Sequence, residues 1–88
     1  MIPEPPPSAR LRVSLFAGMA ERAGRRQIEL PWTGGTVADL QAAVRAACPA
    51  VGPLLERSAI AIGDRYATAG EAVVVGDEVA IIPPVSGG

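Results

Sequence analysis

The sequence predicts an α+β domain in which one main helix packs across a single mixed sheet of four to five strands. Two observations carry this prediction. The periodic segments follow one another in the order strand, strand, helix, strand, strand, and only the central segment has a long helical period. The chain has 88 residues, which is enough for one small domain. Only 3% of the residues are aromatic, so we expect a core of Val, Ile, Leu and Ala side chains.

Two strands are predicted in the first third of the chain, because residues 11–16 and 27–30 alternate in hydrophobicity. The side chains expected to face the core are Leu11, Val13, Leu15, Ile28 and Leu30. A short helix lies between the strands and should end at Gly24, and Pro31 should end the second strand. The two strands are predicted to form an antiparallel hairpin with a broad loop.

The main helix is predicted to begin after Thr36 and to end before Pro49. Thr36 is a good N-cap, and Asp39 three residues later forms a near capping box and places negative charge at the positive helix end. The apolar stripe expected to cover the sheet consists of Val37, Leu40, Val44 and Ala47.

The second half of the chain contains a short helical turn near residues 51–58, a strand at 59–62 and a final strand at 79–82. Gly63-Asp64 and Gly76-Asp77 are typical turn sequences. If the first and last strands lie side by side in parallel, the arrangement is a β-grasp fold. We expect a disordered, Pro-rich leader at 1–10, the domain at 11–82, and an extended Gly-Gly tail at 83–88.

The composition excludes several classes of function. The net charge is −1, so no basic face for nucleic acid is expected, and no apolar stretch is long enough to cross a membrane. The leader has no signal-peptide pattern, and the single Cys48 fits a reducing compartment, so we expect a cytoplasmic protein. Cys48 is expected to be a small packing residue. Arg25-Arg26 is expected to be a solvated loop pair, with contact to an acidic partner surface as the alternative.

The side chains provide few catalytic groups. The chain has no His and no Lys, which removes the usual general base, the commonest metal ligand and the Schiff-base nucleophile. No metal and no cofactor is expected to bind to this chain. Any chemistry is therefore expected to depend on a group other than a side chain.

The chain ends in a tail that could enter a narrow channel in another protein. This tail consists of Pro83-Pro84-Val85-Ser86-Gly87-Gly88. Proline has no backbone N–H, so sheet pairing should end near Ile82. Glycine has the smallest cross-section, and six extended residues reach roughly 20 Å. The carboxylate of Gly88 would be unobstructed. Once activated, for example as an acyl-adenylate, it could accept sulfur to give a thiocarboxylate or an amine to give an amide.

The segment from Gly76 to Gly88, "GDEVAIIPPVSGG", resembles the C-terminal signature of the MoaD branch of the MoaD/ThiS ubiquitin-like sulfur carriers. "VSLFAGMAERAG" and "TVADLQAAV" are similar to the opening strand with its first helix, and to the main helix, of that family. The resemblance covers roughly residues 12–88. The Pro-Pro step favours the molybdopterin branch over the thiamine carriers. Gly63 departs from the pattern, because many relatives have Asn there.

The resemblance implies that the chain is the sulfur-carrier subunit of molybdopterin synthase and is not catalytic alone. A ubiquitin-activating-like adenylyltransferase would use ATP to adenylate Gly88, which would then become a thiocarboxylate. The tail would enter the large synthase subunit, in a heterotetramer with two copies of each chain, and give sulfur to cyclic pyranopterin monophosphate. Gly88 would carry the sulfur. The residues lying along the channel would be Gly87, Ser86, Val85, Pro84 and Pro83.

Three alternatives stay open at this point. The chain could be a sulfur carrier for thiamine thiazole, tRNA thiolation or cysteine synthesis, a ubiquitin-like modifier that forms isopeptide bonds through Gly88, or an interaction module with a disordered tail. A docking surface is also predicted. By alternation, Phe16 and Ile82 point away from the core face, and together with Tyr66 they could form an exposed apolar patch for a partner, or else be scattered surface residues.

Overall fold

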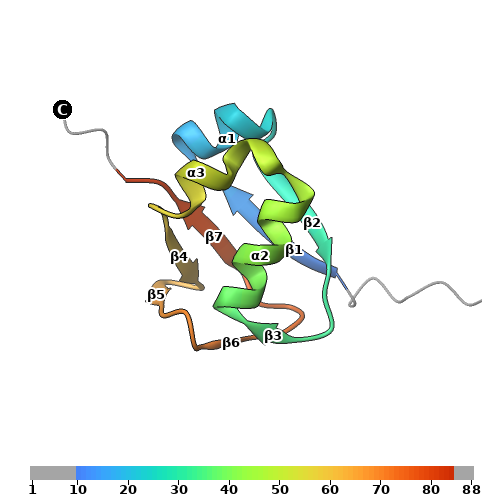
Figure 1. Ribbon diagram of the computed structural model, residues 1–88. Coiled ribbons are helices and arrows are strands. Elements are labelled where there is room, and N and C mark those ends of the chain that lie inside the picture. Colours follow the sequence, from blue (N-terminus) through green and yellow to red (C-terminus); the bar gives the residue numbers. More distant parts are fainter. Residues whose placement is uncertain (1–9, 85–88) are drawn as a thin grey trace, which may run out of the picture.

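The computed structural model describes residues 10–84, and its helices all lie on one face of a mixed five-stranded sheet (Figure 1). The strands of this sheet are β1 (Arg10–Leu15), β2 (Gln27–Pro31), β4 (Ala59–Ile62), β5 (Arg65–Ala67) and β7 (Val79–Ile82). The helices are α1 (Ala17–Ala23), α2 (Val37–Ala47), the 3-10 turn η2 (Pro49–Val51) and α3 (Gly52–Leu55). The remaining strands, β3 (Gly35–Thr36) and β6 (Ala72–Val73), form a separate two-stranded sheet.

The strand order is β2-β1-β7-β4-β5, with β7 in the centre. The first and last of these strands, β1 and β7, are neighbours and run parallel, with Val13 opposite Val79 and Leu15 opposite Ile81. All other neighbours in this sheet are antiparallel. The predicted mixed β-grasp sheet is therefore confirmed. Strand β1 begins at Arg10, the last residue of the predicted leader, and residues 1–9 lie outside the described part of the chain.

The alternation predicted for the sheet is present in the burial of its side chains. Every second residue of β1 and β2 is buried, and Ile60, Ile62, Val79 and Ile81 face the same core from β4 and β7. Gly24 closes α1 in the left-handed conformation, with φ 74°. The alternating burial of the strands and the end of α1 at Gly24 are therefore both as the sequence predicts.

Helix α2 begins at the predicted capping box. The Asp39 backbone N–H donates to Thr36 Oγ1 at 3.2 Å, and the Thr36 backbone N–H donates to Asp39 Oδ2 at 2.9 Å. Val37, Leu40 and Val44 are buried against the sheet, as predicted. The predicted stripe was wrong at Ala47, which is exposed. Cys48 packs partly buried against the core in its place, which confirms the packing role expected for it.

The core also contains one aromatic residue that the aliphatic pattern did not indicate. Trp32 is 6% exposed, and its indole N–H donates to the carbonyl oxygen of Val73 at 2.9 Å. This bond joins the segment after β2 to β6, next to the small β3–β6 sheet. A buried indole needs a partner for its N–H, and the Val73 carbonyl supplies it.

Candidate functional site

The tail leaves the domain from the centre of the sheet. Strand β7 is hydrogen-bonded to β1 on one side and to β4 on the other, and it ends at Ile82, as the two prolines predict. Pro83 is partly buried and Pro84 is exposed, so the chain moves into solvent within two residues of the strand. The remaining predicted channel residues, Val85, Ser86 and Gly87, and the predicted sulfur-bearing Gly88 lie outside the described residues.

Phe16 and Ile82 lie together at the end of the sheet from which the tail leaves. They directly follow the paired residues Leu15 and Ile81 of the parallel strands β1 and β7. Phe16 is the N-cap residue of α1 and half of its surface is exposed, whereas Ile82 is partly buried. Two of the three predicted docking residues are thus placed beside the root of the tail.

Tyr66 reaches the same face of the sheet from β5. It pairs with Ala61 of β4, which in turn pairs with Ala80 of β7, so these three side chains share the face opposite the helices. Tyr66 is 69% exposed. At a strand spacing of about 4.8 Å, it stands about 10 Å from β7, with only alanines between. Three large apolar side chains therefore surround a shallow alanine floor, which the sequence pattern did not reveal because it depends on strand order.

A shallow groove of about 650 Å³ continues along the same face toward the start of β7, with Ser14 and Ala80 among its lining residues. Arg10 and Arg12 lie on its wall, and both form long ion pairs with Glu29, at 3.9 and 3.8 Å. These side chains are largely exposed, so the pairs add little stability. The outer face is thus apolar near the tail and polar at the far end.

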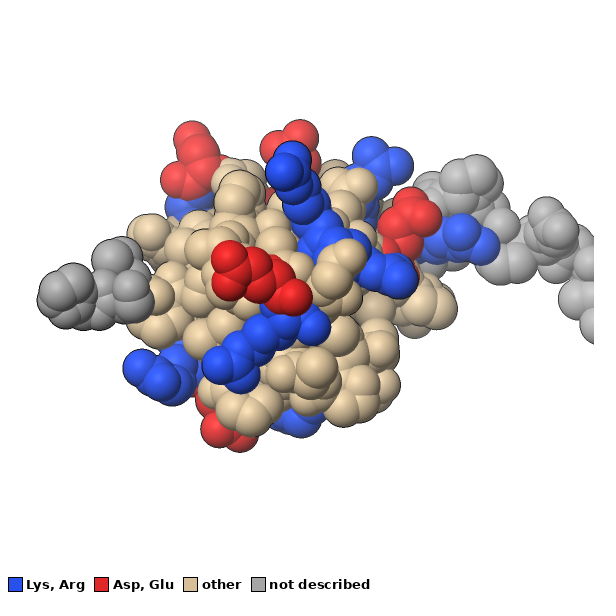
Figure 2. All heavy atoms as spheres, turned by 90° about the horizontal axis from the view of Figure 1, so that it is seen from above, with Lys and Arg blue, Asp and Glu red and all other residues tan. Residues whose placement is uncertain are grey.

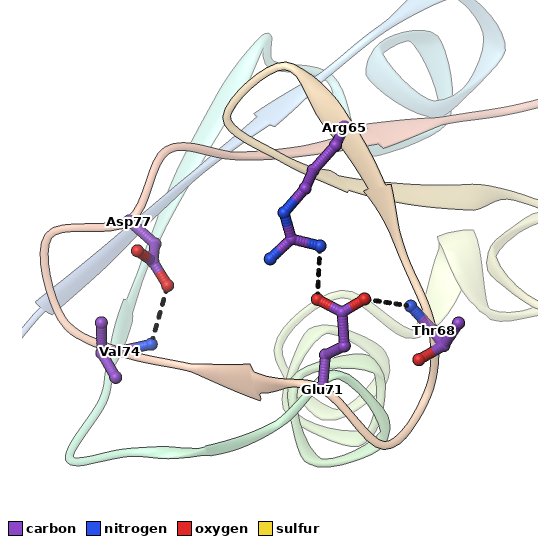
Figure 3. Close-up of polar contacts among 5 residues, drawn as sticks. All are labelled: Arg65, Thr68, Glu71, Val74 and Asp77. Carbon is purple, nitrogen blue, oxygen red and sulfur yellow. Dashed lines mark hydrogen bonds and ion pairs between the residues drawn. The ribbon is translucent and has the colours of Figure 1, made fainter.

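At the end of the domain opposite the tail, a carboxylate ties β5 to the loop that precedes β6 (Figure 3). Arg65 on β5 donates to Glu71 Oε2, and the Thr68 backbone N–H donates to Glu71 Oε1 at 3.3 Å. Hydrogen bonding from Arg65, followed by that from Thr68, lowers the pKa of Glu71 from its ordinary value. The ion pair thus holds the loop in its folded shape.

The same loop caps the first turn of α2. The backbone N–H of Val37 donates to the carbonyl oxygen of Glu71 at 2.9 Å, and that of Ala38 donates to Ala69 at 3.0 Å. Helix N-termini leave such N–H groups without partners inside the helix. Glu71 therefore has a structural role through both its carboxylate and its backbone carbonyl. Asp77 is a further example, because it accepts the Val74 backbone N–H at 2.9 Å (Figure 3). Gly76-Asp77 forms the predicted turn.

Within residues 10–84, no group of three or more His, Cys, Asp or Glu side chains is placed to hold a metal ion. No helix in this part of the chain is long and apolar enough to span a membrane. The described side chains thus form an exposed apolar patch beside the root of the tail, and the groups predicted to carry chemistry lie beyond Pro84.

A model described as the ThiS family matches residues 13–88. Small archaeal modifier protein 1 of Haloferax volcanii is 39% identical over 83 residues, which cover 84% of this chain and 95% of that protein. The molybdopterin synthase sulfur carrier subunit of Dictyostelium discoideum is 33% identical over 85 residues, covering 92% and 99%. A crystal structure of the Haloferax volcanii protein superposes with a TM-score of 0.79 at 33% identity, covering 90% of this chain and 99% of that one.

The family model matches nearly all of the domain together with the tail. The alignments with the two relatives cover almost the full length of each relative. The β-grasp sheet, with its parallel central strands β1 and β7, agrees with the solved relative. The chain therefore belongs to the MoaD/ThiS family of ubiquitin-like sulfur carriers.

Proposed function

We propose that this chain is the sulfur-carrier subunit of a molybdopterin synthase and that the carboxylate of Gly88 carries the sulfur. The observation that supports this most directly is the position of the tail root. A central strand, paired on both sides, is followed by two prolines, the second of which is exposed. The Dictyostelium discoideum relative, which is named a molybdopterin synthase sulfur carrier subunit, aligns with this chain over 99% of its length.

The chemistry proceeds in three balanced steps. The Gly88 carboxylate attacks the α-phosphate of ATP in an adenylyltransferase, which gives an acyl-adenylate and releases pyrophosphate. Hydrosulfide from a sulfur donor then displaces AMP and leaves a thiocarboxylate. In the large synthase subunit, each of two charged carriers passes one sulfur atom to cyclic pyranopterin monophosphate, and water restores its carboxylate. The catalytic groups belong to the partners, which accords with a carrier that has no His and no Lys.

We further propose that Phe16, Tyr66 and Ile82 form the docking patch for the large subunit in a heterotetramer with two copies of each chain. Two of these residues lie beside the tail root, and the third stands across a floor of alanines on the same face. A partner that covers the patch would therefore also lie where the tail emerges. Large exposed apolar groups gathered on one face are typical of interaction sites.

A second candidate function is protein modification, and a specific observation favours it. The relative from Haloferax volcanii, at 39% identity, is named a small archaeal modifier protein. In this role the activated Gly88 would form an isopeptide bond with a lysine of a target protein. The chain has no lysine of its own, so it could be attached singly but could not extend a polymer through its side chains.

Intact-mass spectrometry separates the two functions. The protein is incubated with its adenylyltransferase, ATP and a sulfur donor, and then with the large subunit and cyclic pyranopterin monophosphate. Exchange of one oxygen for one sulfur at Gly88, followed by molybdopterin formation and return to the original mass, supports the synthase role. Sulfur that appears but does not pass to the pterin points to another sulfur pathway. Conjugates of higher mass in a cell extract support the modifier.

A chain with one alanine added after Gly88 tests the terminal mechanism. The added residue should prevent both adenylation and sulfur transfer. The terminal carboxylate would then belong to an alanine and would lie one residue farther from the domain. A matched variant with one alanine added before Met1 should react like the unmodified chain. Normal sulfur loading of the chain extended after Gly88 would refute the proposal.

A further inference from the structure

The two ends of the domain carry opposite charges. The end from which the tail leaves contains five exposed arginines, which we call the basic rim: Arg22, Arg25, Arg26, Arg45 and Arg57. Only two acidic residues accompany them, Glu21 and Glu56. The opposite end contains Asp39, Asp64, Glu71, Asp77 and Glu78 with Arg65, and Arg10 and Arg12 lie on the outer face toward the same end, where both pair with Glu29. The net charge of −1 for the whole chain conceals this separation.

Backbone contacts place the rim around the tail root. The carbonyl oxygen of Arg26 accepts the Leu15 N–H at 2.8 Å, at the end of β1 that lies beside the end of β7. Arg57 precedes Ala59 by two residues, and Ala59 pairs with Ile82, the last residue before the tail prolines. The rim is thus fixed to the two strands that flank β7.

The other rim residues come from helices at the same end. Arg22 is in the last turn of α1, which contacts β7. Arg45 is in the last turn of α2, whose first turn lies at the acidic end, and its stem lies against Gly52 at the start of α3. Figure 2, which views the molecule from above, shows arginine side chains spread over this face, with acidic side chains among them.

Three of the five acidic side chains at the opposite end are held by hydrogen bonds, whereas none of the rim arginines forms an ion pair within residues 10–84. Asp39, Asp77 and Glu71 each accept a backbone N–H, and Glu71 also holds Arg65. Among residues 10–84, the only arginines in ion pairs are Arg10, Arg12 and Arg65, and none of these belongs to the rim.

Helix dipoles account for part of the rim. Arg22 and Arg45 are favourable near the negative C-terminal ends of α1 and α2. Arg25, Arg26 and Arg57 lie beyond the last residues of the helices. Three like charges placed around one strand end repel one another unless an opposite charge approaches.

We propose that the basic rim docks against an acidic protein surface that surrounds the mouth of the channel receiving the tail. This rests on the proposed function, in which the tail enters the large synthase subunit. The rim steers the carrier so that it approaches tail first, because the positive end of the molecule is also the end that carries the reagent. The apolar patch then forms the close contact, whereas the rim acts on the rate of encounter.

The test measures association of the carrier with the large subunit of molybdopterin synthase from the same organism. The variant Arg25→Gln/Arg26→Gln/Arg57→Gln removes three positive charges from the rim. We expect its association rate constant to fall by about tenfold at low salt, with little change in the dissociation rate constant. The difference should shrink between about 0.02 M and 0.5 M salt, because screening shortens the range of the field.

A matched control separates local charge from net charge. The variant Thr33→Glu/Ala69→Glu/Ala72→Glu changes the net charge by the same amount, at exposed positions near the acidic end. Its association rate should stay within about twofold of the unmodified chain, since the added charges lie at the end remote from the tail. Circular dichroism confirms that both variants are folded.

The possible results distinguish a failure of the steering role from a failure of the proposed function. If the unmodified carrier binds the large subunit and the rim variant associates equally fast, the steering role is wrong while the proposed function stands. The steering role is equally wrong if the control variant slows as much as the rim variant. If the unmodified carrier does not bind the large subunit at all, the proposed function fails, and the inference fails with it.

Discussion

Replacement of Gly35 by alanine tests how the start of α2 is held in place. Gly35 has φ 150°, a backbone conformation that side chains rarely adopt. An added methyl carbon would lie 2.9 Å from Asp39 Oδ2 and 3.3 Å from Trp32 Cζ2. It would therefore press at once on the capping box of α2 and on the buried indole. Neither neighbour can move freely, because Asp39 Oδ2 is bonded to the Thr36 N–H and the Trp32 N–H is bonded to Val73.

Gly34 provides the matched control for the magnitude. It also has a positive φ, 122°, but an added methyl carbon would meet no atom within 4 Å. Gly34→Ala should therefore cost only the backbone strain, about 1–3 kcal/mol of the free energy of unfolding. Gly35→Ala adds the loss of the cap, about 1 kcal/mol, and overpacking of about 1–3 kcal/mol. The two variants should therefore differ by about 2–4 kcal/mol.

Urea unfolding measures this difference, and Trp32, the single tryptophan, provides the fluorescence signal. Each kcal/mol should also lower the melting temperature by about 4–8 °C in a domain of this size. Far-UV circular dichroism provides a second signal that does not depend on the indole. A difference of less than about 1 kcal/mol between the variants would refute the reasoning, since the contacts with Asp39 and Trp32 would then be absorbed without cost.

Two further predictions concern pH and docking. Because the folded-state pKa of Glu71 is lowered, its ion pair with Arg65 stabilises the fold above the ordinary pKa of the carboxyl group, and this contribution should disappear as the pH falls through the folded-state pKa. Unfolding measured across the acid range should therefore show a smaller loss of stability for Glu71→Gln than for the unmodified chain. Equal losses would show that the ion pair between Arg65 and Glu71 does not stabilise the fold. In the docking patch, Phe16→Asp/Ile82→Asp should weaken binding to the large subunit at least about tenfold through a faster dissociation rate, because these residues form the close contact. Arg12→Asp, a charge change on the same face but away from the tail, should leave the dissociation rate unchanged, and an unaltered affinity of the double variant would exclude the patch.

The strands and the main helix could be predicted because their signals are local. Alternation in β1 and β2, the cap at Thr36 and the prolines after Ile82 each act within a few residues. The one error in the helical stripe lies at the end of the helix. Ala47, the last residue of α2, is exposed, whereas the C-cap residue Cys48 packs against the core.

Features that depend on distant pairing could not be predicted in the same way. The β3–β6 sheet has two residues in each strand, too few to show a period, and Trp32 is buried because Val73, far along the chain, accepts its N–H. The alanine floor between Tyr66 and Ile82 likewise exists only because β4 lies between β5 and β7. The basic rim is drawn from four separate segments, which sequence spacing alone does not bring together.

The central position of β7 has a mechanical consequence. A carrier whose tail is held in a channel is pulled by that tail when the two proteins separate. The pull acts on a strand that is hydrogen-bonded to parallel β1 on one side and to antiparallel β4 on the other. Because β1 begins at the opposite end of the sheet, tension between Arg10 and Pro84 runs along the strands and strains their hydrogen bonds together rather than one at a time. A pull on Pro84 would therefore load the hydrogen bonds on both sides of β7 together.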